Sequence, residues 1–294
     1  MFGECHAHLI MDGKNYKEAV SRHKNGVDEE VLKEHLAAYQ AEGITFVRDG
    51  GDSYGVSELA KVMAEGYGID YRSPIFAIHK KGHYGGIVGK GFETFSEYRE
   101  LIDQVRNRGG DFIKIMISGI MEYREWGLLS EESLEPEEIR EMIHIAHEEG
   151  FAVMIHGNGR KAVLAAAEAG ADSVEHGNYI DEDCMYAMAE QGCVWVPTIV
   201  TTKNLLGCGR YEDRVLESIY RTECENLAKA YQSGVQLALG SDAGAYLVPH
   251  GKAVAQELEI FQEVLGKKGD RELVSHLKLG EEKIRERFCR GYIN

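Results

Sequence analysis

The feature that most constrains the fold is a regular alternation of short apolar segments, rich in β-branched and aromatic residues, with longer helical patterns. The apolar segments are residues 4–10, 43–49, 73–79, 111–118, 151–156, 171–176, 193–200 and 235–242. Several of the helical stretches between them end on glycine, a common helix stop. This alternation predicts a parallel sheet, and eight repeats indicate a closed (β/α)8 TIM barrel. An open, doubly wound sheet is the alternative, but it is not expected to gather polar residues at most strand ends.

The length of the chain, 294 residues, fits one large α/β domain as well as two small ones. Only four prolines occur, and no Ser/Gly-rich linker interrupts the repeats. Apolar residues make up 44% of the chain, which is enough for a sizeable core. We therefore predict a single barrel domain over residues 1–294.

The charge balance narrows the choice of partners. Lysine and arginine number 33 and aspartate and glutamate 49, a net charge of −16, which disfavours nucleic acid and anionic membranes as partners. The six cysteines form no CxxC pair, and neither a secretion leader nor an apolar run of about 18 residues is evident. We expect a cytoplasmic protein with reduced thiols and a small-molecule substrate.

Polar side chains stand where the predicted strands end, which is where TIM barrels carry their chemistry. These residues are His6 and His8, Lys114, His156, His176 and Asp242. Side chains two apart on a strand point to the same side, so both imidazoles of the first pair are aimed at one point.

Each of these residues has an ordinary structural explanation when it is taken alone. A single histidine can be a satisfied core residue, and an aspartate after a strand is often a helix cap. Lys114, inside the apolar run FIKIMIS, is harder to explain, since a buried lysine has to be neutralised, paired or modified. Together, nitrogen ligands and a carboxylate suit Zn²⁺ and related divalent ions. A lysine carbamylated by carbon dioxide becomes a carboxylate that can bridge two such ions.

The set of polar residues and its surroundings resemble the binuclear-metal branch of the amidohydrolase superfamily. Its members include Xaa-Pro dipeptidase-like and imidazolonepropionase-like enzymes. The matching segments are HAH, VRDGGD, GHYGG, IKIMISG, IHGNG, SVEHG, VPT, LGSDAG and PHGKAVAQELE. The resemblance covers nearly the whole chain.

The resemblance implies a ligand set and a mechanism. One metal would be held by His6, His8 and Asp242, the other by His156 and His176, with an N6-carboxylated Lys114 bridging both. Two divalent ions, with zinc as the first choice, would then share a hydroxide nucleophile. Asp242 would take its proton and pass it to the leaving nitrogen.

Two departures from the superfamily pattern shape our expectations. Relatives carry a small β-sandwich built from segments on both sides of the barrel, and we expect either a minimal barrel without it or a sequence whose start is set too late. We therefore expect strand 1 to gain support from contacts in a homo-oligomer. Mononuclear deaminases of the superfamily lack the bridging lysine and carry a glutamate shortly after the strand-5 histidine. Here GNGRKAV follows His156, so hydrolysis is favoured over deamination.

Substrate specificity is expected to come from the loops that follow the strands. These loops are residues 79–94, 118–135, 200–211 and 243–251. His83 and His250 fall in two of them and are our candidates for substrate contact. A flexible surface loop is an equally good interpretation of residues 79–94.

We therefore predict a metal-dependent hydrolase that cleaves the C–N bond of a dipeptide or N-acyl amino acid. Hydrolysis of a lactam, lactone or ester is the alternative within enzymes. An inactive metal-binding barrel is the alternative from another class.

Overall fold

The computed structural model describes residues 1–266 and 271–290. All the strand pairs in this part of the chain are parallel. The strands are β1 (Glu4–Ala7), β2 (Phe46–Asp49), β3 (Asp70–Arg72), β4 (Ala77–Lys80), β5 (Gly89–Phe92), β6 (Ile113–Met116), β7 (Val153–Gly157), β8 (Ser173–His176), β9 (Val194–Val196) and β10 (Gln236–Leu237). Their hydrogen-bonded orders are β1-β2-β3 and β10-β9-β8-β7-β6-β4-β5.

Backbone hydrogen bonds join these two sets of strands into a ring. β3 pairs with β2 and β4 pairs with β6, so β3 and β4 act as one strand broken at residues 73–76. On the other side, the amide of Cys5 donates to the carbonyl of Leu239 at 2.9 Å, and the amide of Asp242 donates to the carbonyl of His6 at 2.8 Å. The last strand is thereby joined to the first, and the predicted TIM barrel is confirmed.

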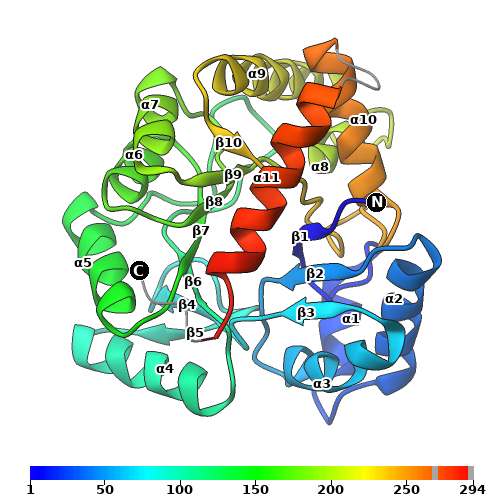
Figure 1. Cartoon of the computed structure of the whole chain (residues 1–294), viewed down its shortest axis with the longest axis vertical. Helices are drawn as coiled ribbons and strands as arrows, with labels where there is room; N and C mark the ends of the chain where they lie inside the picture. The colour runs from blue at the N-terminus through cyan, green and yellow to red at the C-terminus, as the bar shows by residue number, and fades with distance from the viewer. Residues whose placement is uncertain (267–270, 291–294) are drawn as a thin grey trace.

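Helices surround the strands (Figure 1). They are α1 (Tyr16–Arg22), α2 (Glu29–Ala41), α3 (Val56–Met63), η1 (Ala64–Tyr67), α4 (Phe95–Asn107), α5 (Pro136–Glu148), α6 (Arg160–Glu168), α7 (Glu182–Gln191), α8 (Val200–Lys203), α9 (Asp213–Gln232), α10 (Ala253–Leu265) and α11 (Arg271–Arg287). Within the described residues, no helix is both long enough and apolar enough to cross a membrane.

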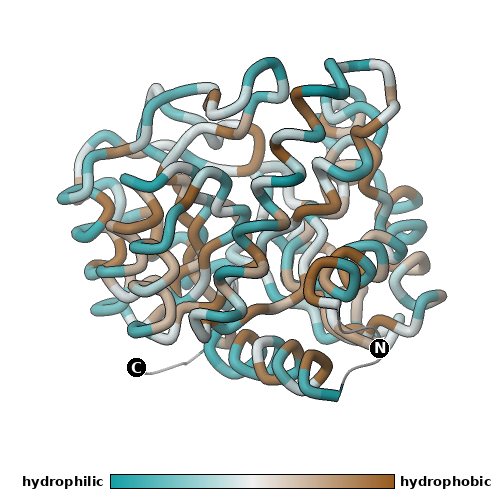
Figure 2. Tube along the Cα trace, turned by 90° about the horizontal axis from the view of Figure 1, so that it is seen from above, coloured by the Kyte–Doolittle hydropathy of each residue, from teal (hydrophilic) through white to brown (hydrophobic). Residues whose placement is uncertain are grey.

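Helix α11 lies across one end of the barrel, where Figure 2 shows it as a separate layer beneath the other elements. Ile284 of this helix and Phe288 just beyond it are buried in one cluster with Phe46 and Phe112, which lie at the starts of strands β2 and β6. The rings of Phe112 and Phe288 meet edge to face with centroids 5.2 Å apart. The amino ends of the strands are therefore covered, and the opposite end carries the polar side chains.

Residues 79–94 and 193–200 are two of the predicted segments that differ from the structure. The loop predicted at residues 79–94 contains β5, which pairs with β4 from Gly89 onward. A Cβ on Gly89 would lie 2.3 Å from the carbonyl oxygen of Ala77, so this pairing needs glycine, a residue that ordinarily argues against a strand. The strand predicted at residues 193–200 ends at Val196, because Pro197 has no amide hydrogen to donate.

Candidate metal centre

Strand β1 and the segment after β10 bring His6, His8 and Asp242 together. Their nearest side-chain atoms lie within 4.8 Å of one another, close enough for one ion. The Nε2 atoms of His6 and His8 are 3.3 and 3.6 Å from Oδ1 of Asp242. A Cβ on Gly50 would lie 2.2 Å from Cε1 of His8, so only glycine at this position leaves room for that ring.

His176, at the end of β8, and His156, on β7, continue this group. The four imidazoles form a row in the order His8, His6, His176, His156, with successive ring centroids 5.3, 5.0 and 4.8 Å apart. Burial lowers the pKa of all four rings, to about 3 for His8 and His156. Neutral imidazoles with free ring nitrogens are metal ligands rather than cations.

Lys114, on β6, is buried at the same end of the barrel, and its Nζ has no hydrogen-bond partner among the described residues. A buried amine without a partner is costly unless something else occupies its surroundings. Burial lowers its pKa to about 8, while the charges of Glu175 and Asp242 act in the opposite direction. Lys114 therefore brings an amine without a hydrogen-bond partner to the same end of the barrel as the four imidazoles and the carboxyl group of Asp242.

Burial also raises the pKa of Asp242 to about 7, although Lys114 opposes the shift. The backbone of Asp242 has φ 58°, a left-handed conformation that aspartate tolerates better than most residues. Strain of this kind is found where the surrounding structure fixes a functional side chain.

His6 is oriented by a buried network that links three strands. Its Nδ1 lies 2.9 Å from Oε2 of Glu175, which leaves Nε2 facing Asp242. Glu175 in turn accepts two hydrogen bonds from the guanidinium of Arg48, at 2.8 and 3.0 Å, and one from the hydroxyl of Ser173 at 2.5 Å. A carboxylate behind a ligating histidine fixes the orientation of the ring and the nitrogen that is presented.

We expect Glu175→Ala to be strongly destabilising, because it leaves the buried cation of Arg48 without a partner. Breaking such a pair costs about 3–5 kcal/mol in the free energy of unfolding. Urea unfolding of the metal-free protein measures the loss. The matched control is Glu212→Ala, which removes the partner of Arg214 at an exposed site. A Glu175→Ala variant as stable as this control would contradict the argument.

His176 has its own support. Its Nδ1 lies 2.8 Å from the hydroxyl oxygen of Thr198. Both backbones are left-handed, with φ 64° and 55°. For a β-branched residue such as Thr198 this conformation is a genuine outlier, so the hydroxyl is held there against local preference.

Replacement of Thr198 by valine keeps the shape of the side chain and removes this hydroxyl. We expect the variant to bind zinc about 10–100-fold more weakly, as for other residues that support a ligand. Competition with a zinc-binding dye measures the affinity. An unchanged dissociation constant would show that Thr198 does not orient His176.

The ligand cluster opens into a cavity of about 690 Å³. His8, Lys114, His156, His176 and Asp242 all contribute to its lining. A concave site of this size, partly apolar and with a few convergent polar groups, suits a small organic molecule.

The sequence model of the amidohydrolase family matches residues 4–269. The chain belongs to the amidohydrolase family. Members of this superfamily are generally metal-dependent.

Ochratoxinase of Aspergillus niger is 28% identical over 232 residues, an alignment that covers 70% of this chain and 46% of ochratoxinase. An uncharacterized protein of Mycobacterium tuberculosis is 30% identical over 132 residues, covering 43% of this chain and 35% of that protein. The chain thus spans half or less of the length of these curated relatives.

Solved structures show the same fold. A Xaa-Pro dipeptidase with methionine in its active site superposes with a TM-score of 0.77 and 23% identity, covering 100% of this chain and 77% of that one. The crystal structure of A. niger ochratoxinase gives a TM-score of 0.75 and 22% identity, with 95% and 70% covered. The amidohydrolase barrel is therefore established, while the roles of individual residues have to be argued from this chain.

The two histidines predicted as substrate contacts in this amidohydrolase lie in different surroundings. His83 is about one-third exposed, and its Nδ1 lies 3.5 Å from Oε1 of Glu131. His250 is buried, and its ring nitrogens lie 3.0 Å from the hydroxyl of Tyr39 and 2.8 Å from the carbonyl of Met11. Neither is among the residues that line the large cavity, so both roles stay predictions.

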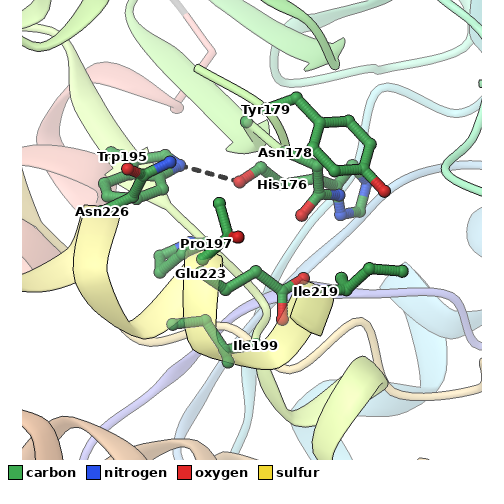
Figure 3. Close-up of a pocket in the computed structure, with 11 residues that line it drawn as sticks. His176, Asn178, Tyr179, Trp195, Pro197, Ile199, Ile219, Glu223 and Asn226 are labelled. Carbon is green, nitrogen blue, oxygen red and sulfur yellow. Dashed lines mark hydrogen bonds between the residues drawn. The ribbon is translucent and has the colours of Figure 1, made fainter. Parts of the chain in front are cut away.

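A second, much smaller cavity of about 10 Å³ lies beside His176 (Figure 3). Its size suits a single water molecule. Glu223 of α9 lines it, and Oε2 of this buried carboxyl has no hydrogen-bond partner among the described residues. Burial raises the pKa of Glu223 well above its ordinary value, which favours the protonated form that can donate a hydrogen bond to such a water.

Sequence reasoning did not identify Arg48, Glu175, Thr198 or Glu223. Glu175 and Arg48 stand inside segments quoted for the family resemblance, SVEHG and VRDGGD, and a charged residue inside an apolar strand was the available signal. Thr198 also stands in a quoted segment, VPT, but it carries no charge, and Glu223 gave no comparable signal.

Proposed function

We propose that the chain is a metal-dependent hydrolase that cleaves the C–N bond of a small amide or peptide. The observation that carries this proposal is the gathering of four neutral imidazoles, an unpartnered lysine and a carboxyl group beside one large cavity. The names of the amidohydrolase relatives, ochratoxinase and Xaa-Pro dipeptidase, support the same class of reaction.

The residues fit two divalent ions. His6, His8 and Asp242 would hold one, and His156 and His176 would hold the other. Lys114 would contact both after its amine has taken up carbon dioxide, which turns an unpartnered amine into a carboxylate. Zinc is the first choice for such nitrogen and carboxylate ligands. When bound, the ions would activate a water molecule and polarise the scissile carbonyl.

Asp242 is the group that we propose moves the proton. It accepts the proton of the attacking water and then delivers it to the leaving nitrogen, which departs as an amine. Asp242 lies in the wall of the large cavity, where a substrate would bind. Glu175 and Thr198 keep His6 and His176 in the orientation that this geometry requires.

Carbamylation of Lys114 should be visible in the dependence of metal uptake on bicarbonate. The neutral amine attacks carbon dioxide and loses a proton. A pKa of about 8 leaves roughly a tenth of the amines neutral at pH 7, far more than for an ordinary lysine. In metal-stripped protein we expect bicarbonate to accelerate recovery of activity with zinc. At a fixed concentration of dissolved carbon dioxide, recovery should slow as the pH falls from 8 to 6, because the amine becomes protonated. Recovery indifferent to bicarbonate throughout this range would contradict carbamylation.

The proposed function is tested by assaying zinc- or manganese-loaded protein against dipeptides, N-acyl amino acids, lactams, lactones and esters. Release of an amine from a dipeptide or an N-acyl amino acid, abolished by chelation, is the expected result. Turnover confined to lactams, lactones or esters would show that the substrate belongs to one of these classes and is not a dipeptide or an N-acyl amino acid. No turnover with any class, in protein that holds its metals, would favour an inactive metal-binding barrel.

A further inference from the structure

The wall of the large cavity is rich in cations, although the chain as a whole carries a net charge of −16. Asp242 is the one carboxyl group among the residues that line it. The cations are Lys14, Lys17, Lys114 and Arg210. Metal ions at the ligand cluster would add further positive charge. The cavity therefore favours an anion over a neutral or cationic molecule.

None of these four cations forms an ion pair with a carboxylate among the described residues. Among the described residues, no ion pair forms at the side chains of Lys14, Lys17 or Arg210. Several cations on the outer helices, by contrast, are paired with carboxylates. Arg160, for example, contacts both Asp181 and Asp183. Lys14, Lys17 and Arg210 are therefore available to a ligand at this opening.

Arg210 is held in place by aromatic rings. Its guanidinium carbon lies 4.7 Å from the ring centroid of Tyr246 and 5.4 Å from that of Tyr211. Tyr211 in turn stands 5.3 Å from Tyr123, centroid to centroid. All four residues line the cavity, and they come from three different loops. Stacking on tyrosine fixes the plane of the guanidinium and leaves its edge free to bind a carboxylate through two hydrogen bonds.

We propose that Arg210 binds a carboxylate of the substrate, with Lys14 and Lys17 adding attraction at the opening and the tyrosines contacting an apolar neighbouring group. This inference rests on the proposed function and makes it more specific. The substrate is an amide that carries a free carboxylate beside an aromatic or large apolar side chain. Dipeptides and N-acyl amino acids satisfy this description, whereas uncharged lactams and esters do not.

The test compares an acid with its uncharged counterpart. The probes are N-acetyl-L-phenylalanine and N-acetyl-L-phenylalaninamide, which differ in one carboxylate. Binding of both is measured by calorimetry to zinc-loaded Asp242→Asn protein, in which turnover is blocked, with and without Arg210→Gln. We expect Arg210→Gln to weaken binding of the acid about 10–100-fold, as loss of a charge-assisted bidentate contact does, and to change binding of the amide less than twofold. Arg210→Lys should retain part of the affinity for the acid. Lysine keeps the positive charge but cannot donate the two parallel hydrogen bonds of a guanidinium.

The matched control is Arg214→Gln, an exposed arginine that contacts Glu212 outside the cavity. It should leave the affinities for both probes unchanged. Equal losses for the acid and the amide in Arg210→Gln would show a structural role and overturn the proposal. Absence of measurable binding of the acid to the protein with Arg210 intact would also overturn it. If the protein binds the acid selectively but hydrolyses no amide, the proposed function is refuted, while the carboxylate-binding role of Arg210 is supported.

Discussion

Replacement of Asp242 by asparagine should lower turnover about 10²–10⁴-fold, the usual contribution of general acid–base catalysis. An amide cannot take the proton of water, but its oxygen can still ligate an ion. Asparagine also tolerates the left-handed backbone at this position, where φ is 58°, so the loop should keep its conformation. The measurement is kcat with the best amide substrate, together with metal content on the same sample.

The control for Asp242→Asn is Asp183→Asn, which removes one partner of Arg160 on the outside of the barrel. It should retain full activity. An Asp242→Asn variant that keeps most of its metal and has lost its turnover fits the proton-transfer role. Unchanged turnover in that variant would refute the role.

Replacement of Lys114 by methionine should lower both metal content and turnover, the latter at least about 10²-fold, because the bridging carboxylate can no longer form. Stability should move in the opposite direction. Methionine has a similar length and no amine to desolvate, so the free energy of unfolding of the metal-free protein should stay the same or rise. Metal analysis, kcat and urea unfolding on one preparation separate these effects.

Two further variants sharpen the test on Lys114. Lys161→Met removes an exposed lysine that contacts Glu135 and should change nothing at the site. Lys114→Ala leaves a gap that a small carboxylate such as propionate can enter, and we expect propionate to restore part of the metal content. A Lys114→Met variant that retains its metals and its activity would contradict a ligand role for Lys114.

Much of the candidate site follows from the sequence because a barrel imposes simple geometry. His8, His156, His176 and Asp242 stand at or near the ends of their apolar segments, and parallel strands bring such ends to one rim. The alternation of segments predicted the barrel, and the sequence thereby predicted the convergence of His6, Asp242 and their neighbours. The structure adds distances and the row of four rings.

The supporting contacts could not be predicted in the same way, because they depend on how strands far apart in the chain are brought into contact. Arg48 and Glu175 are 127 positions apart and meet inside the closed barrel. Thr198 orients His176 through an unfavourable backbone conformation that no propensity anticipates. The position of His250 in a loop after a strand predicts substrate contact, but its two ring nitrogens contact Tyr39 and Met11.

The carboxylate site at Arg210 illustrates a related limit. The positive charge of Arg210 is evident from the sequence. Whether that charge is free to bind a ligand depends on which acidic residues lie nearby in the folded chain. The cavity wall contains Asp242 as its one carboxyl group, in a chain with 49 acidic residues. Only the folded arrangement shows that the cations at this opening are left without partners.

The most direct test of the central claim is the number of metal ions bound per chain, measured by plasma emission spectrometry after loading with zinc and removal of excess ion. The two-ion site predicts about two zinc ions per chain, falling to one or fewer in Lys114→Met. A protein that retains no zinc, or whose zinc content is the same in Lys114→Met, would contradict it.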